Sequence, residues 1–107
     1  MTQAERQGII KQVVGEIVTL VHPVKVLLFG SAADKKNKET SDLDFLIVVS
    51  DQQDPNQTLD RLNLGVKTRV LPCDFVVATE KMIKKYGQRD GLVYREALTS
   101  GIVLYAA

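Results

Sequence analysis

The sequence predicts a single α/β domain, residues 1–107, in which helical and strand segments alternate along the chain. Its 107 residues suffice for one hydrophobic core and leave no room for a separate substrate domain. With 45% hydrophobic and 25% charged residues, the composition is that of an ordinary globular protein. Amphipathic stretches at helical spacing alternate with short apolar runs, and this order is typical of a compact α/β layer structure.

The first expected element is an amphipathic helix that ends at His22-Pro23. Its apolar residues recur every four positions: Ile9/Ile10, Val13/Val14, Ile17/Val18 and Val21. Thr2 and Glu5 have the spacing of a capping box at the start of this helix. Pro23 ends it, because proline cannot continue the hydrogen-bond ladder.

Three strands are expected from short apolar runs, at residues 24–29, 42–49 and 74–78. The first run is mostly apolar, as is usual for a central strand. Gly30 turns the chain after this run, and residues 31–33 begin a short helix. A solvated loop that contains Lys35, Lys36 and Lys38 then leads to the second strand.

A second long helix is expected between the second and third strands. Pro55 is well placed at its start, because the fixed φ of proline suits the first helical position. Apolar residues then fall at helical spacing: Leu59, Leu62, Val66 and Val70. This spacing predicts that the helix continues past Gly65 to the vicinity of Pro72.

The C-terminal part is expected to form two short helices and a strand. Thr79 caps the first helix, which ends near Gly87. The second helix ends at Gly101 and turns four residues inward: Val93, Tyr94, Ala97 and Leu98. Residues 102–105 add a short final strand.

Two aspartates stand at the beginning of the second predicted strand. Alternate residues of a strand point the same way, so Asp42 and Asp44 project side by side. Two carboxylates on one rigid face repel each other and lose solvation unless a cation lies between them. Mg²⁺ prefers oxygen ligands and often takes further oxygens from substrate phosphates. The pair therefore predicts a magnesium site for a phosphate-bearing substrate.

Asp74 and the Gly30-Ser31 turn complete this candidate site. Asp74 opens the third strand, so it can lie at the same edge of the sheet as the other two aspartates. Gly30-Ser31 precede Asp42 by ten intervening residues, and the backbone N–H groups of such a turn attract phosphate near a helix start. A phosphate-sized turn combined with three strand-borne aspartates predicts metal-assisted nucleotidyl transfer.

The segment GSAADKKNKETSDLDFLIVV, together with the later PCDFVV, resembles the minimal nucleotidyltransferases of the DNA polymerase β-like superfamily. The C-terminal YREALTSGIVLY is also similar to the end of these domains, so the resemblance spans nearly the whole chain. It implies a polymerase β-like fold, a small mixed β-sheet flanked by helices. It also implies that Gly30 and Ser31 bind the phosphates of the donor ATP, and that Asp42, Asp44 and Asp74 bind two Mg²⁺ ions and carry the catalysis.

The turn departs from the family pattern after its first two residues. The family commonly continues as Gly-Ser-x-Ala-Arg-Gly, whereas this chain has Ala32-Ala33-Asp34-Lys35. An acid thus stands in place of the usual arginine. One of the loop lysines is a candidate for the missing positive charge; alternatively these lysines form only a solvated loop face.

The resemblance further implies a protein partner, because the chain has no acceptor-binding domain of its own. Minimal nucleotidyltransferases are often paired with a helical HEPN-domain ribonuclease toxin, and they act as antitoxins by transferring AMP to a toxin tyrosine. This is the function expected here. Two alternatives stay open: a non-catalytic antitoxin or scaffold, which Asp34 favours, and transfer to a small-molecule hydroxyl with a helical partner completing the pocket.

Charge and cysteine content indicate which partners and which cellular compartment to expect. Fourteen Lys and Arg against thirteen Asp and Glu give a net charge of +1, which disfavours a dedicated nucleic-acid binder. The lone Cys73 excludes an internal disulfide and fits a reducing cytosol. No apolar run approaches a membrane-spanning length, and no targeting segment is recognised. A cytoplasmic protein that binds no membrane is therefore expected.

Overall fold

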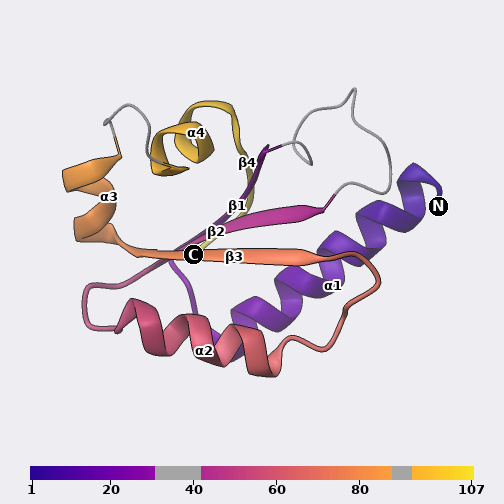
Figure 1. Cartoon of the computed structure of the whole chain (residues 1–107), viewed down its shortest axis with the longest axis horizontal. Helices are drawn as coiled ribbons and strands as arrows, with labels where there is room; N and C mark the ends of the chain where they lie inside the picture. Colours follow the sequence, from indigo (N-terminus) through magenta and orange to yellow (C-terminus); the bar gives the residue numbers. More distant parts are fainter. Residues whose placement is uncertain (31–41, 88–92) are drawn as a thin grey trace.

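A computed structural model describes residues 1–30, 42–87 and 93–107 of the chain (Figure 1). Every helix and strand that the structure describes was expected from the sequence. In chain order the elements are α1 (Gln3–Val21), β1 (Lys25–Phe29), β2 (Leu43–Val49), α2 (Pro55–Gly65), β3 (Cys73–Thr79), α3 (Glu80–Tyr86), α4 (Val93–Ser100) and β4 (Ile102–Ala106). The strand boundaries differ from the predicted ones by one residue, at both ends of β3 and at one end of each other strand.

The four strands of the described chain form one mixed sheet in the order β3-β2-β1-β4. Strand β1 pairs antiparallel with β2 on one side and with β4 on the other. Strands β2 and β3 run parallel, with α2 as the connection between them. This topology confirms the predicted fold class, and it places the apolar first strand in the interior of the sheet, as its composition indicates.

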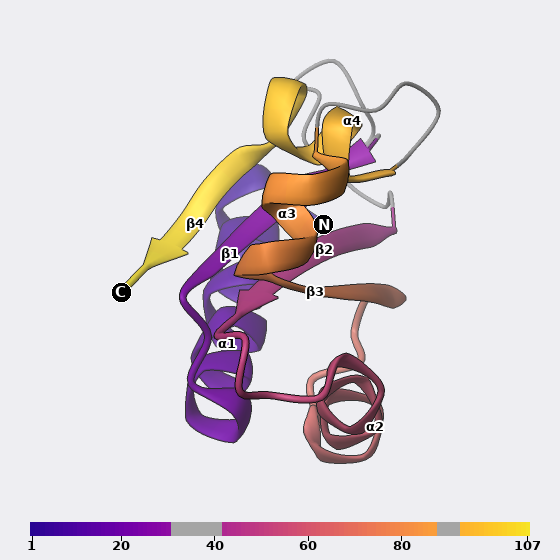
Figure 2. The same ribbon diagram turned by 90° about the vertical axis from the view of Figure 1, so that its left-hand side faces the viewer.

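Helices cover both faces of the sheet (Figures 1 and 2). Helices α1 and α2 lie on one face, where residues of both pack against alternate residues of β2: Leu43, Phe45, Ile47 and Val49. Helices α3 and α4 lie on the other face, where Ala97 packs with Leu46 and Val48. The strict alternation along β2 decides which face each side chain of the candidate site occupies.

The capping box predicted for α1 is present at its first residues. The Glu5 backbone N–H donates to Thr2 Oγ1 over 3.1 Å, and the Thr2 N–H donates to Glu5 Oε1 over 3.1 Å. The helix ends at Val21, and His22 follows in a left-handed conformation with φ 47°. The N-cap of α3 is simpler: Thr79 Oγ1 accepts from the Met82 N–H, as the sequence predicts for this cap.

The prediction that α2 continues to the vicinity of Pro72 is wrong, because the helix ends at Gly65. Val66 is already extended, with φ −73° and ψ 119°. The backbone N–H of Lys67 donates to Glu16 Oε1 over 2.7 Å, and that of Thr68 donates to Glu16 Oε2 over 3.3 Å. A glutamate of α1 thus takes up backbone donors that a continued helix would have used internally.

We expect a Glu16→Gln substitution to loosen the segment that leads into β3. Burial acts to raise the pKa of Glu16, but the hydrogen bonds from Lys67 and Thr68 and the charge of Arg69 outweigh it, so the pKa is lowered. A carboxylate with a lowered pKa stabilises the fold above its unfolded pKa of about 4.3, and this contribution is lost as the pH falls further. The variant should lose about 1 kcal/mol at pH 7.

Urea unfolding of both proteins between pH 7 and pH 3 measures this contribution. The stability difference between wild type and Glu16→Gln should shrink as the pH falls through the folded pKa of Glu16. A difference that stays constant over this range would show that the carboxylate charge is not what holds the segment.

The predicted helix start at residues 31–33 and the loop lysines Lys35, Lys36 and Lys38 lie outside the described residues. Of the helices in the described part of the chain, none combines the length and apolarity that a membrane span requires.

Candidate active site

Asp44 and Asp74 lie directly opposite each other on neighbouring parallel strands. The register of β2 with β3 pairs Asp44 with Asp74, and neighbouring strands lie about 4.8 Å apart. Asp44 shares its side of β2 with Leu46 and Val48, which pack beneath α3 and α4. The two carboxylates therefore occupy the α3/α4 face, at the edge where β2 and β3 begin.

Gly30 lies against the Asp44 carboxylate. It directly follows β1, whose last residue, Phe29, pairs with Asp44. Gly30 has φ +70°, and a Cβ built on it would lie 2.6 Å from Asp44 Oδ2. Only glycine combines this backbone conformation with such a close approach. The turn and the carboxylate pair are thus parts of one constellation.

The Asp44 carboxylate lies in a strongly negative and partly desolvated environment. Burial raises its pKa most, followed by the charge of Asp74 and a hydrogen bond with it, and then by the charges of Asp42 and Glu96. All three charged groups that raise the pKa of Asp44 are carboxylates. The site therefore has an excess of negative charge that a bound cation would relieve.

Asp42 occupies a different position from the other two aspartates. It precedes β2 and is exposed, although its charge still acts on Asp44. Within residues 1–30, 42–87 and 93–107, no three His, Cys, Asp or Glu side chains are placed so that they could hold a metal ion together. The structure brings Asp44 and Asp74 together, and a metal site that uses all three aspartates stays a prediction.

The Asp44–Asp74 pair fits a divalent cation on the evidence of its own electrostatics. The two carboxylates face each other across adjacent strands, and the charge of Asp74 adds to the effect of burial in raising the pKa of Asp44. A hard cation that prefers oxygen ligands, such as Mg²⁺, suits this donor set. Ser31, the other residue predicted to bind phosphate, lies outside the described residues.

Glu96 is a charged neighbour of the site that the sequence reasoning did not find. It lies on α4, and its charge contributes to the raised pKa of Asp44. The helical periodicity placed the adjacent Ala97 on the inward face, and Ala97 is indeed fully buried. The sequence contains no signal for where α4 crosses the sheet, so nothing in it connects Glu96 with Asp44.

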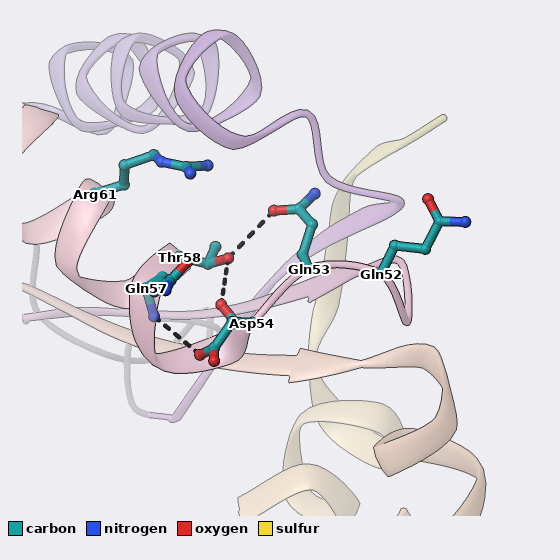
Figure 3. Close-up of a pocket in the computed structure, with 6 residues that line it drawn as sticks. All are labelled: Gln52, Gln53, Asp54, Gln57, Thr58 and Arg61. Atoms are coloured by element: carbon teal, nitrogen blue, oxygen red, sulfur yellow. Dashed lines mark hydrogen bonds between the residues drawn. The ribbon is translucent and has the colours of Figure 1, made fainter.

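A polar cavity of about 170 Å³ lies at the other end of β2, beside the start of α2 (Figure 3). Its polar groups bind one another. Gln53 Nε2 donates to the Val21 carbonyl, Thr58 Oγ1 donates to Gln53 Oε1, and Asp54 Oδ1 accepts from the N–H groups of Asn56 and Gln57. These bonds join the end of α1 to the start of α2, and we assign the cavity a structural role.

Residues 11–107 match the family described as Polymerase beta, Nucleotidyltransferase. The chain belongs to this family. The match covers β1, β2 and β3 and therefore includes Gly30 and the three candidate aspartates. No curated protein sequence matches the chain significantly.

Two solved structures share this fold at low sequence identity. The first is a candidate nucleotidyltransferase from Sulfolobus solfataricus, with a TM-score of 0.66 and 17% identity; the match covers 97% of this chain and 83% of that one. The second is a mutant of the toxin–antitoxin MntA–HpeT, with a TM-score of 0.56 and 18% identity; the match covers 95% of this chain and 73% of that one. At these identities the likeness concerns the fold.

Proposed function

We propose that this nucleotidyltransferase moves AMP from ATP to a hydroxyl group of a partner protein in a Mg²⁺-dependent reaction. The observation that carries the proposal is the juxtaposition of Asp44, Asp74 and Gly30 at one edge of the sheet in a chain of this family. The carboxylate pair supplies oxygen ligands for a cation, and the backbone N–H groups of a glycine turn beside it can bind the phosphate that the cation accompanies.

The residues of the site have three roles in the proposed reaction: phosphate binding, metal binding and proton transfer. Gly30 and Ser31 bind the β- and γ-phosphates, and Asp42, Asp44 and Asp74 hold one or two Mg²⁺ ions. Bound Mg²⁺ neutralises the charge that develops as pyrophosphate leaves. The acceptor oxygen bonds to the α-phosphorus, the bond from that phosphorus to the bridging oxygen breaks, and Asp74 takes the hydroxyl proton. Asp74 is exposed and can therefore meet an acceptor from outside.

We further propose that the acceptor is a tyrosine of a HEPN-domain toxin and that the chain acts as its antitoxin. The fold shared with MntA–HpeT supports a toxin as partner. That solved complex carries two aspartate-to-glutamate substitutions two positions apart, the same spacing as Asp42 and Asp44. The carboxylates lie where β2 and β3 begin, and Asp74 is exposed there, so a second protein could bring an acceptor hydroxyl to them.

A second candidate function is a non-catalytic antitoxin that binds its toxin without modifying it. Asp34 favours this reading, because it stands where related domains commonly have an arginine that can bind phosphate. The facing Asp44 and Asp74 carboxylates argue against it, since a site without a cation gains no stability from two carboxylates on neighbouring strands.

Single-turnover transfer of labelled AMP tests the proposal, with Mg²⁺ and a HEPN-domain toxin of the kind proposed as the partner offered as acceptor. We expect a labelled tyrosine on the partner. Asp74→Asn should retain Mg²⁺-ATP binding within a few-fold and lose transfer by about 10²-fold or more, because the proton acceptor is removed while the phosphates stay bound. Asp60→Asn, an exposed carboxylate on α2, is the matched control.

The outcomes separate the candidate functions. Full transfer by Asp74→Asn would remove this residue from the mechanism. Binding of the partner with no label on it would favour the non-catalytic antitoxin, and transfer to a small hydroxyl compound in place of the protein would replace the proposed acceptor.

A further inference from the structure

Helix α4 packs on the face of the sheet that carries Asp44. Its Ala97 is fully buried and belongs to a cluster of buried residues from three strands: Leu27, Phe29, Leu46, Val48 and Ala78. Phe29 is also the register partner of Asp44, so the helix and the carboxylate share one stretch of β1 as a neighbour. The residues beside Ala97 on α4 are therefore candidates for contact with the site.

The two neighbours of Ala97 lie on opposite flanks of α4. Successive residues of an α-helix are rotated by about 100°, so Glu96 and Leu98 point to opposite sides when Ala97 faces the sheet. Leu98 lines a cavity that also includes Val48, near the end of β2. It lies close to the end of α3 as well, because a Cβ built on Gly87 would be 2.9 Å from Leu98 Cδ1. Leu98 thus occupies the flank towards α3, and Glu96 occupies the other one.

The flank of α4 that carries Glu96 faces the beginning of β2. In Figure 1, α3 lies to the left of α4, whereas β2 and β3 begin on the right. Asp44 is the second residue of β2 and projects on the α3/α4 face. The charge of Glu96 acts on Asp44, in agreement with this arrangement.

Glu96 experiences two opposing electrostatic effects in the metal-free protein. It is exposed in the first turn of α4, where a carboxylate interacts favourably with the helix dipole. The nearby aspartates repel it, because they carry the same charge. A divalent cation bound by Asp44 and Asp74 would add an attraction to Glu96 that outweighs this repulsion.

We infer that Glu96 is a positioning residue of the proposed active site, whose charge increases the affinity of the Asp44–Asp74 pair for a divalent cation. The inference rests on the proposed function, which supplies the cation site. Glu96 need not touch the metal ion, because the attraction between unlike charges extends over about 10 Å at moderate salt. The aspartates act on the cation from the strands, and Glu96 adds negative charge from the helix.

Binding of Mn²⁺ to the purified chain, measured by electron paramagnetic resonance, tests the inference. Mn²⁺ prefers the same oxygen ligands as Mg²⁺. Glu96→Gln should weaken Mn²⁺ binding by about threefold or more at low salt, because one negative charge beside the site is removed. The difference should shrink at about 0.5 M salt, where the charges are screened.

Two further variants separate charge from structure. Glu96→Asp keeps the charge and should bind Mn²⁺ within about twofold of the wild type. Glu80→Gln is the matched control, since Glu80 is an exposed carboxylate in the first turn of α3 and lines the cavity on the other flank of α4. It should leave Mn²⁺ binding unchanged.

Urea unfolding in a chelator gives a second readout that needs no metal. Glu96→Gln is introduced into the wild type and into Asp44→Asn, and the shifts of the unfolding midpoint are compared. The loss of the interaction with the helix dipole is the same in both backgrounds, but repulsion by Asp44 is relieved only in the wild type. Glu96→Gln should therefore lower the midpoint less in the wild type than in Asp44→Asn.

The outcomes distinguish this inference from the proposed function. A wild type that binds no Mn²⁺ would contradict the cation site of the proposed function. If the wild type binds Mn²⁺, equal affinity in Glu96→Gln, a loss that Glu96→Asp does not restore, or equal midpoint shifts in the two backgrounds would each overturn the inference alone. Equal midpoint shifts would show that Glu96 serves only the helix dipole of α4.

Discussion

Replacing Asp44 by Asn is expected to reduce nucleotidyl transfer by about 10²-fold or more while leaving the metal-free protein at least as stable as the wild type. The carboxylate is partly desolvated and repelled by Asp74, Asp42 and Glu96, so its removal relieves a penalty in the folded state. Asn has the same shape, and its amide can donate a hydrogen bond to Asp74. The same change removes a ligand of the proposed Mg²⁺ site.

The pH dependence of this stability change has a definite sign. The pKa of Asp44 is raised in the folded state, so the folded protein binds the proton more readily than the unfolded chain does. The penalty is therefore present above the folded pKa and disappears as the pH falls towards the unfolded pKa of about 3.9. Thermal unfolding in a chelator should show an advantage of Asp44→Asn at pH 7 that shrinks on acidification.

Calorimetry of Mg²⁺-ATP binding completes this experiment. Asp44→Asn together with Asp42→Asn is expected to abolish divalent-cation binding, and Asp42→Asn alone reports whether the exposed aspartate is a ligand. Equal Mg²⁺-ATP affinity in wild type and double variant would exclude the metal site. Asp60→Asn serves again as the control for a change of charge at a distance.

The parts of this fold that depend on local sequence were predictable. Residues 9–21 repeat with a helical period, and Thr2 with Glu5 gives the capping box, so α1 has the expected limits. The strands were predictable from local sequence too, because they are short apolar runs with turn residues at their ends. What the sequence does not contain is the contact between Glu16 and the segment after α2, and for this reason the end of α2 was predicted too late.

The candidate site shows the same division between local and tertiary information. The sequence places Asp44 and Asp74 at the beginnings of two strands, and that placement does not depend on the rest of the fold. The parallel register that sets them opposite each other is a tertiary fact, as is the effect of the Glu96 charge on Asp44. The approach of Gly30 to Asp44 Oδ2 likewise depends on how β1 pairs with β2.

Gly30→Ala is expected to destabilise the protein by about 2 kcal/mol or more and to weaken nucleotide binding at the same time. Two separate effects contribute. At φ +70° an L side chain is strained whatever the space around it, and the new Cβ would lie 2.6 Å from Asp44 Oδ2. The carboxylate must move, which disturbs its pairing with Asp74. Gly30→Val, with a larger side chain beside the phosphate turn, should cost more in both properties.

Gly15→Ala is the control for this substitution, because a Cβ at Gly15 meets nothing within 4 Å and the residue lies inside α1. It should stabilise the chain by about 0.5–1 kcal/mol through helix propensity alone. A double-mutant cycle then separates the two costs at Gly30. In an Asp44→Ala background the clash with the carboxylate is gone and the backbone strain stays, so Gly30→Ala should destabilise less than in the wild type. An unchanged cost would mean that Gly30 acts through its backbone conformation alone, and the turn would then have no steric connection to the carboxylate pair.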